Sequence, residues 1–378
     1  MPAVPGVQAA TRGVPELRLL QRPPGQSCQG RLSPLRLPVS TITVAVDAMG
    51  GDQAPGAVVA GAIQAARRGI PIKLTGPLAL LTAAVEEQGG RDVTDLAIVD
   101  ATEAVSMDES PLVAHRRKRG SSVRVAAALV ERGEAQALFS AGHTGATYLA
   151  ARAAFGVMPG VERPALAVTV PTRTGAAVLL DAGANLYCRA EHLCQFGVLG
   201  AAYARILLHV DRPKVGLLSI GEEATKGTDV VREAHALLER APVDFIGNLE
   251  AREFFSGRAD VIVCDGFTGN IALKVGEGLV EAAEKMLREE MGSQLVSQIG
   301  ALLTRGAFLR FKQRVDYAES GGALLAGLNR VAVVGHGRST PQAIQNGIAM
   351  AARLAGEDIV TRLAEALSSA AYPGRQAG

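Results

Sequence analysis

From residue 42 onward, short apolar runs alternate with longer segments of helical periodicity. Several runs, such as DVIVCDG at 260–266 and RVAVVGHG at 330–337, are apolar almost throughout, as expected of strands covered on both faces. Strands that alternate with helices favour a doubly wound, mostly parallel sheet. The sequence therefore predicts an α/β fold. The short link PTRTG between 165–170 and 176–181 predicts one β-hairpin within it.

The pattern gives an expected position for each element. Strands are predicted at 42–47, 71–75, 95–100, 136–140, 165–170, 176–181, 214–220, 243–246, 260–264 and 331–335. Helices are predicted at 56–68, 77–88, 121–132, 144–156, 190–208, 228–240, 269–291 and 340–368.

Composition narrows the classes of partner. Hydrophobic residues make up 48% of the chain, which is ample for a large core, and aromatic residues only 4% with no Trp. Few aromatics argue against stacking on single-stranded nucleic acid. Residues 1–40 hold five arginines and one acid, whereas the remainder has 34 basic and 36 acidic residues. The body of the chain is therefore no polycation, and we expect no nucleic-acid partner.

The first forty residues differ from the rest. They contain seven of the 18 prolines and no periodic pattern, so we expect a disordered Pro/Arg-rich extension before a single α/β catalytic domain at 41–372. The N-terminus lacks an apolar signal core, and no apolar run reaches the roughly 18 residues of a membrane-spanning helix. The four cysteines form no C-x-x-C pair, so we predict reduced cytosolic thiols and no zinc.

Glycine-rich loops follow many of the predicted strands. They are DAMGGD (47–52), SAGHTGA (140–146), DAGAN (181–185), SIGEEATKGTD (219–229), CDGFTGN (264–270) and GHGRST (335–340). Each alone is ordinary turn chemistry, but six in one sheet are expected to converge on one edge and line one crevice. Backbone N–H groups of such loops bind oxyanions well. The loops therefore predict a phosphate or acyl-phosphate site.

Few side chains in these loops carry reactive groups. No G-x-S-x-G motif, dinucleotide fingerprint or metal-type histidine pair occurs. Lys226 can meet an anion or remain a surface lysine, and Asn270 can bind a ligand or cap the helix after it. Asp265 fits an orienting carboxylate or a turn residue equally well, and His143 and His336 lie in glycine loops.

Two basic segments stand apart from the glycine loops. HRRKRGSS at 115–122 places Arg116, Arg117, Lys118 and Arg119 in a row, either as a solvated turn or as a docking patch for an acidic partner. The segment 293–315 mixes basic residues with apolar ones and contains no acid. It fits an amphipathic membrane-surface segment or a core or dimer helix. Its apolar candidates for membrane contact are Leu302, Leu303, Phe308, Leu309 and Phe311.

From about 42 to 350 the chain resembles the PlsX-type phosphate acyltransferases of bacterial phospholipid synthesis. The stretches that carry the resemblance are VAVDAMGGDQAP, RRKRGSS, SAGHTGA, RPALA, DAGAN, EHLCQFGVLGAAYA, GEEATKGTD, FIGNLEAREFFSG, ADVIVCDGFTGNIALKVGEG and GHGRS. Three positions depart from the family pattern: His143 replaces its usual Asn, Ser219 replaces Asn before IG, and 320–327 read SGGALLAG rather than YGGAPLLG.

The resemblance implies a three-layer α/β/α sandwich, related to phosphotransacetylases and isocitrate-type dehydrogenases and working as a homodimer. The implied reaction moves a fatty acyl group from acyl carrier protein to inorganic phosphate, with no cofactor or metal. The family's important lysine and asparagine match Lys226 and Asn270. Substrate contacts are expected from the loop residues Asp47, Gly50, Gly51, Asp52, Ser140, Gly142, His143, Thr144, Gly145, Asp265, Gly266, Thr268, Gly269 and His336.

The implied product, an acyl phosphate, suits handover to a glycerol-3-phosphate acyltransferase at the inner face of the cell membrane. We therefore expect a cytoplasmic protein attached peripherally through an amphipathic helical segment at about 269–316. The alternatives are a phosphotransacetylase-like enzyme that uses acyl-CoA and a non-catalytic membrane scaffold. A dinucleotide dehydrogenase is a weaker alternative, because the glycine fingerprint is missing.

Overall fold

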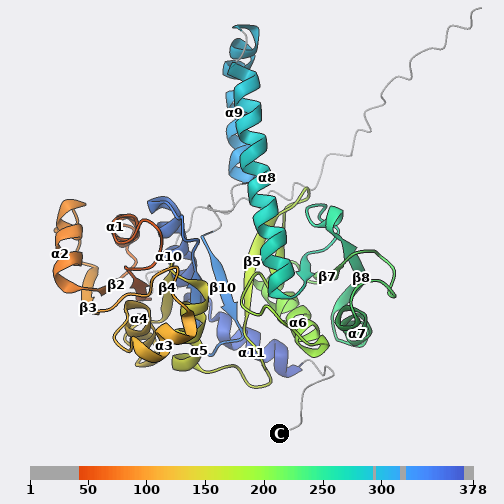
Figure 1. Cartoon of the computed structure of the whole chain (residues 1–378), viewed down its shortest axis with the longest axis horizontal. Helices are drawn as coiled ribbons and strands as arrows, with labels where there is room; N and C mark the ends of the chain where they lie inside the picture. The colour runs from red at the N-terminus through yellow and green to blue at the C-terminus, as the bar shows by residue number, and fades with distance from the viewer. Residues whose placement is uncertain (1–41, 293–294, 316–320, 370–378) are drawn as a thin grey trace, which may run out of the picture. The chain divides into compact units, whose positions relative to one another are not determined.

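A computed structural model of the chain describes residues 42–292, 295–315 and 321–369, which belong to one compact unit (Figure 1). Within these residues eleven strands form one sheet in the order β3-β2-β1-β4-β11-β10-β5-β6-β9-β7-β8. The strands are β1 (Val44–Asp47), β2 (Ile72–Gly76), β3 (Leu96–Asp100), β4 (Ala137–Ser140), β5 (Ala165–Pro171), β6 (Ala176–Leu180), β7 (Lys214–Ser219), β8 (Asp244–Glu250), β9 (Val261–Val263), β10 (Ala323–Ala326) and β11 (Val331–Val334).

Helices cover both faces of the sheet. They are α1 (Gly56–Ala66), α2 (Leu78–Glu87), α3 (Pro111–Arg117), α4 (Ser122–Glu131), α5 (Thr144–Phe155), α6 (Ala190–Leu207), α7 (Asp229–Leu238), α8 (Gly266–Gly292), α9 (Leu295–Val315), α10 (Pro341–Gly356) and α11 (Ile359–Ser369), with a short 3₁₀ helix at Ala251–Glu253. The predicted α/β/α sandwich is confirmed.

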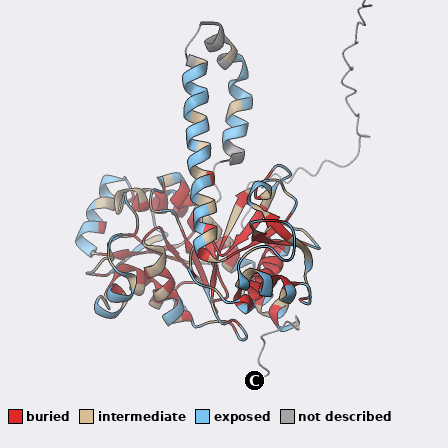
Figure 2. Cartoon of the chain, turned by 45° about the vertical axis from the view of Figure 1, so that its right-hand side comes forward, coloured by how far each residue is buried: buried red, intermediate tan, exposed pale blue. Residues whose placement is uncertain are grey.

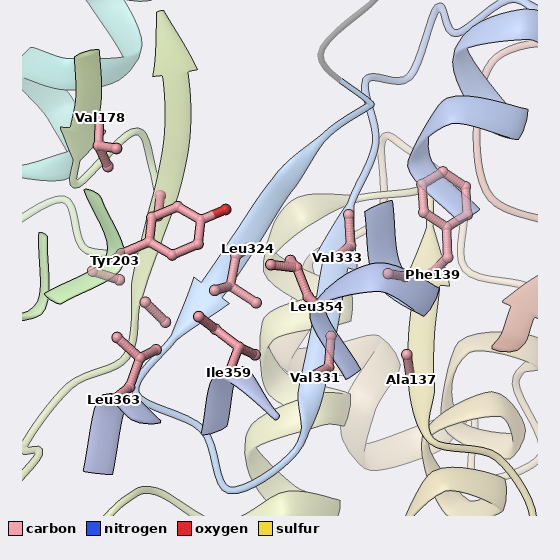
Figure 3. Close-up of a cluster of buried hydrophobic side chains, with 14 of the residues drawn as sticks. Ala137, Phe139, Val178, Tyr203, Leu324, Val331, Val333, Leu354, Ile359 and Leu363 are labelled. Atoms are coloured by element: carbon pink, nitrogen blue, oxygen red, sulfur yellow. The ribbon is translucent and has the colours of Figure 1, made fainter. Parts of the chain in front are cut away.

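Strand residues alternate between two apolar cores. Val331 and Val333 face a core shared with α1, α6, α10 and α11, whereas Ala332 and Val334 face a core shared with α4 and α5. Figure 3 shows the first core, in which Tyr203 of α6 and Leu354 of α10 approach the sheet from helices far apart in sequence. Burial on both faces explains why these strands are apolar throughout.

The sheet consists of two parallel groups with opposite directions. β1, β2, β3, β4 and β11 are parallel to one another, and so are β6, β7, β8 and β9. Between them β10 is antiparallel to both β11 and β5, and β5 is antiparallel to β6, which confirms the predicted hairpin. The expectation that all six glycine loops leave from one edge is therefore wrong, because the intervening strands reverse the direction of the sheet.

The register nevertheless brings the two sets of strand ends to the same level. Val334, the last residue of β11, pairs with Ala323 of β10. The next residue of β10, Leu324, pairs with Ala167 of β5. On the other side Leu179, near the end of β6, pairs with Val168 of β5. The carboxyl ends of the two groups thus reach the middle of β5 from opposite directions, and the loops after them are the candidates for a common site.

Three elements differ from the sequence prediction. β10 was not predicted, because ALLA is four residues long and follows two glycines rather than a helix. α3 was not predicted either, so Arg116 and Arg117 lie in the last turn of a short helix rather than in a turn. The predicted helix 340–368 is two helices, α10 and α11, which are separated where Asp358 adopts a φ of +50°.

α8 and α9 lie side by side and are mostly exposed (Figure 2). Lys312 of α9 pairs with Glu284 of α8 at 3.0 Å, so the two helices run in opposite directions. The apolar side chains Leu303, Leu309 and Phe311 of α9 are exposed, and Phe308 is half-buried. The side chain of Leu302 and the predicted extension 1–40 lie outside the described residues. In the described ranges, no helix is both long enough and apolar enough to cross a membrane.

Candidate functional site

The first group of loops rests on a buried carboxylate. Asp47 ends β1, is buried, and accepts a hydrogen bond from Ser140 Oγ at 2.8 Å. Burial raises the pKa of Asp47 above its usual value, and the hydrogen bond from Ser140 opposes that shift. The buried Ser140 hydroxyl also accepts from the backbone N–H of Gly142 at 3.2 Å. Asp47 and Ser140 therefore hold two neighbouring loops together from below.

Glycines allow these two loops to touch through their backbones. A Cβ on Gly50 would lie 2.6 Å from the Gly142 nitrogen, far closer than real Cβ atoms approach. Gly51 has a φ of +114°, and the backbone N–H of Asp52 donates to the Gly337 carbonyl at 2.8 Å. The loops after β1, β4 and β11 thus form one continuous surface.

His143 departs from the family pattern and has a local structural role. It is the N-cap of α5, and its Nδ1 accepts from the backbone N–H of Gly145 at 3.1 Å. A side-chain acceptor at this position satisfies an N–H group that otherwise lacks a partner. Thr144 and Gly145 open the helix directly after it.

α8 links the first group of loops to the second. It starts after β9, and its Lys274 contacts the His336 ring in the loop after β11. Glu277 lies 2.8 Å from Lys274 Nζ and 3.7 Å from His336 Nε2. Burial and the Lys274 ammonium hold the pKa of His336 below its usual value, against the effect of Glu277. Lys274 is not among the predicted site residues, although its position four residues after Asn270 places both on one helical face.

The second group of loops rests on Asp181, which directly follows β6 and is fully buried. The backbone N–H groups of Leu166, Gly183 and Ala184 donate to its Oδ1 at 2.9–3.0 Å. Asn185 donates twice to Oδ2, from its backbone at 2.6 Å and from its side chain at 2.8 Å. Burial raises the pKa of Asp181, and these donors oppose the shift. Asp181 is not among the predicted site residues, although it starts DAGAN, one of the predicted glycine-rich loops.

The first turn of α8 packs directly on the Asp181 loop. A Cβ on Gly269 would lie 2.0 Å from the Asp181 carbonyl oxygen, and one on Gly266 would lie 2.7 Å from the Asn185 carbonyl oxygen. Asp265 caps the helix: its Oδ1 accepts from the Thr268 backbone N–H at 2.8 Å and its Oδ2 from the Thr268 hydroxyl at 3.1 Å. Asp265 is therefore bound to the first turn of α8, and its expected contact with substrate stays a prediction.

Asn270 lies inside α8 rather than at its start, so it does not cap the helix. Its side chain is exposed, and a Cβ on Gly183 would meet it at 3.7–3.8 Å. Its amide forms no hydrogen bond with another described residue. The amide therefore points to the surface beside the Asp181 loop, with its donors available to a ligand.

Lys226 lies at the same edge of the sheet as Asn270. It follows β7, and β7 is parallel to and paired with β9, from which Asn270 follows. Its side chain is exposed and forms no ion pair with the described acids. The nearby Glu222 lies 3.6 Å from both Arg252 and Arg258 instead. An ammonium group without a carboxylate partner is available to an anionic ligand.

The cysteines near this site are poor nucleophiles. Burial, together with Asp181 and Asp265, raises the pKa of the Cys188 thiol to about 12. Burial also raises the pKa of Cys264, well above its usual value. The thiolate is the reactive form of cysteine, so neither residue is prepared to form an acyl-enzyme. Within the described ranges, no three His, Cys, Asp or Glu side chains gather as metal ligands do.

The basic row at the end of α3 divides into two kinds of residue. Arg116, Arg117 and Arg119 are exposed. Lys118 instead donates to the Ala104 carbonyl at 2.8 Å and pairs with Glu109 at 2.6 Å. Lys118 therefore anchors the segment, and the three arginines form its outward surface.

Solved structures of other proteins share this fold. A phosphotransacetylase from Streptococcus pyogenes aligns with a TM-score of 0.55 at 19% identity, covering 84% of this chain and 94% of that one. The EutD phosphotransacetylase from Staphylococcus aureus aligns with a TM-score of 0.54 at 16% identity, covering 83% and 94%. The predicted relation to the phosphotransacetylase fold is confirmed.

Sequence comparison gives closer similarities. A phosphate acyltransferase from Geobacter sp. (strain M21) is 48% identical over 332 residues, which cover 88% of this chain and 94% of the relative. One from Syntrophotalea carbinolica is 48% identical over 323 residues, covering 85% and 93%. Residues 42–362 match the family described as fatty acid synthesis protein. The whole site described above lies inside that match, and the chain belongs to this family, as its glycine loops had indicated.

Proposed function

We propose that this chain transfers a fatty acyl group from acyl carrier protein to inorganic phosphate, which gives an acyl phosphate for phospholipid synthesis. The observation that best supports this proposal is the position of Lys226 and Asn270. Both residues follow neighbouring parallel strands, both are exposed, and neither side chain pairs with a described carboxylate. The relatives' name, phosphate acyltransferase, supports acyl transfer over a non-catalytic scaffold.

The proposed chemistry needs few groups from the protein. A phosphate oxygen attacks the thioester carbonyl carbon, the tetrahedral oxyanion collapses, and the C–S bond breaks to release the carrier's thiolate. A thiol with a pKa of about 8.5 is a good leaving group, so no strong general acid is required. The site must position phosphate and stabilise the oxyanion. We assign the first task to Lys226 with the glycine loops and the second to the Asn270 amide.

The buried residues have a supporting part in this proposal. Asp47 and Ser140 hold the loops after β1 and β4, so we place them beneath the ligand rather than against it. The backbone of Gly50, Gly51 and Gly142 and the exposed Asp52 lie above them. His336 and Lys274 join these loops to α8.

A direct assay with single variants tests the proposal. Purified protein is mixed with acyl-acyl carrier protein and phosphate, and acyl phosphate is trapped with hydroxylamine. Lys226→Ala and Asn270→Ala are each expected to reduce turnover about 10²–10³-fold, because each removes one charge-stabilising donor. Melting temperatures should stay near wild type, since both side chains are exposed. Near-normal turnover in both variants would contradict the assignment.

We propose that Arg116, Arg117 and Arg119 attract the acidic carrier protein, while Lys118 keeps the segment in place. Complementary charge mainly accelerates encounter, so the effect belongs to the association rate and depends on salt.

We propose separate partners for the two exposed helices. Along α8 the exposed residues Phe267, Ile271, Val275 and Leu279 recur every four positions and form one apolar ridge. A ridge that starts beside the site suits a second copy of the chain in a homodimer. On α9, the exposed residues Leu303, Leu309 and Phe311 lie among basic residues. This combination suits contact with the anionic inner face of the cell membrane.

A further inference from the structure

A cavity of about 600 Å³ lies beside the Asp181 loop, a volume within the range of small-molecule sites. Its lining includes Tyr148, Arg152, Arg163, Asn185, Leu186 and Tyr187. Two family stretches meet here, RPALA with Arg163 and DAGAN with Asn185. Neither Arg152 nor Arg163 has a part in the chemistry assigned to Lys226 and Asn270.

The cavity lining contains two arginines, Arg152 and Arg163. No carboxylate lies within ion-pair distance of Arg152 or Arg163 in the part of the chain that the structure describes. The acid in the lining, Glu162, is already occupied: Arg189 Nη2 donates to it at 2.6 Å, and His192 lies at 3.1 Å. Arg163 is held by one bond, from its Nη1 to the Tyr187 carbonyl at 3.0 Å. A guanidinium has five N–H donors, so most of them remain for a ligand.

The lining also includes uncharged surface. The Tyr148 ring is buried and its hydroxyl is hydrogen-bonded with Arg152, whereas Leu186 is exposed and Tyr187 is 87% exposed. A fatty acyl chain in this cavity would remove water from two arginines without replacing it, which is costly. Inorganic phosphate would pair with the arginines but leave the aromatic and aliphatic walls without a partner. The lining therefore fits a ligand with one anionic end and a longer uncharged body.

The cavity adjoins the reacting groups. Asn185, in its wall, is the residue whose backbone packs on Gly266 at the start of α8. Gly183, two residues earlier, faces the Asn270 side chain. Gly266 and Asn270 are one helical turn apart, about 6 Å along the axis. A ligand anchored by the arginines can therefore extend along the Asp181 loop toward Asn270.

We infer that this cavity binds the phosphopantetheine arm of the acyl donor, with Arg152 and Arg163 on its phosphate and Tyr148, Leu186 and Tyr187 against its uncharged body. The inference rests on the proposed function, because the arm is what brings the thioester to the site. The same arm occurs in acyl carrier protein and in coenzyme A, so the cavity serves either donor and does not choose between them.

Steady-state kinetics with three donors tests the inference. Acyl-acyl carrier protein and acyl-CoA both carry the arm, whereas acyl-N-acetylcysteamine keeps the thioester and lacks the phosphate. Arg152→Gln and Arg163→Gln are each expected to lower kcat/KM about tenfold for the first two donors, as expected for a lost charge-assisted hydrogen bond. The truncated donor and the KM for inorganic phosphate should not change. Arg132→Gln removes an exposed arginine that pairs with Glu134 and is the matched control.

Three results would overturn the inference. An equal loss with the truncated donor would mean that the arginines do not read the arm's phosphate. A raised KM for inorganic phosphate would place them at the nucleophile. A loss confined to acyl-CoA would show that they bind its nucleotide end, which acyl carrier protein lacks.

Binding without turnover separates this inference from the proposed function. Calorimetry compares phosphopantetheine with pantetheine on wild-type protein and on the double variant Arg152→Gln with Arg163→Gln. We expect wild type to bind phosphopantetheine more tightly and the variant to bind both equally weakly. If wild type transfers no acyl group from any donor, the proposed function fails, and the binding comparison still tests the cavity. Equal binding of phosphopantetheine and pantetheine by wild type would refute the assignment of the cavity to the phosphopantetheine arm.

Discussion

At the scale of single residues, two glycines of α8 differ in whether the structure has room for a side chain. Gly269 touches the Asp181 carbonyl, whereas a Cβ on Gly278 would meet nothing within 4 Å. Gly269→Ala should therefore cost about 1–3 kcal/mol or more of stability and reduce activity by displacing Asn270. Gly278→Ala should stabilise the protein by about 0.5–1 kcal/mol and leave activity unchanged. Denaturant titration and the acyl phosphate assay give both quantities, and a tolerated Gly269→Ala would refute the contact.

The arginine row of α3 makes a second prediction for individual side chains. Arg116→Glu with Arg117→Glu should lower kcat/KM for acyl-acyl carrier protein about tenfold at low salt and flatten its salt dependence. The truncated donor should react as with wild type, because it has no carrier to attract. Arg91→Glu with Arg132→Glu applies the same charge change to other exposed arginines. If the control pair has the same effect, the row has no special part in docking.

Much of the residue-level account was available from sequence. Lys226 and Asn270 could be chosen because they stand in glycine-rich stretches after apolar runs and match the family's lysine and asparagine. The alternatives for Asp265 and Asn270 could not be decided, since they depend on where α8 begins, and helix starts are the least certain part of such predictions. Asp181 was missed because a buried carboxylate and an exposed one look alike in sequence.

At the scale of elements, α8 has three faces with different neighbours. Its first turn packs on the Asp181 loop, Lys274 reaches the loop after β11, and the ridge from Phe267 to Leu279 remains exposed. Most of these contacts join residues distant in sequence, so periodicity alone indicated a helix and an amphipathic segment but not their neighbours.

Paired variants distinguish the proposed partners of α8 and α9. Leu303→Glu with Phe311→Glu should reduce binding to anionic vesicles at least tenfold, because each apolar side chain contributes up to roughly 1.5–3 kcal/mol when buried. The mass of this α9 double variant in solution should remain that of a dimer. Val275→Glu with Leu279→Glu should instead give a monomer in sedimentation equilibrium. If the α9 variant dissociates or aggregates, α9 belongs to the dimer or the core, and the membrane proposal fails.

At the scale of the whole described unit, the class of fold followed from the alternation of strands and helices, but the course of the sheet did not. The reversal depends on β10, a four-residue strand that inserts antiparallel between β11 and β5. Its sequence, ALLA, carries no period that separates strand from helix. Without β10, the six loops seemed to share one edge. With it, two groups of loops meet at the middle of β5 and α8 connects them.

In the proposed reaction, phosphate itself attacks the thioester and no acyl-enzyme intermediate forms. Raised thiol pKa values at Cys188 and Cys264 support it. The most direct test measures thiol release from acyl-acyl carrier protein in rapid quench, with and without phosphate, while intact-mass spectrometry follows the protein. We predict no release without phosphate, saturable release with it, one acyl phosphate for each thiol, and an unchanged protein mass. A burst of one thiol per active site without phosphate, together with an acyl adduct on the protein, would contradict this account.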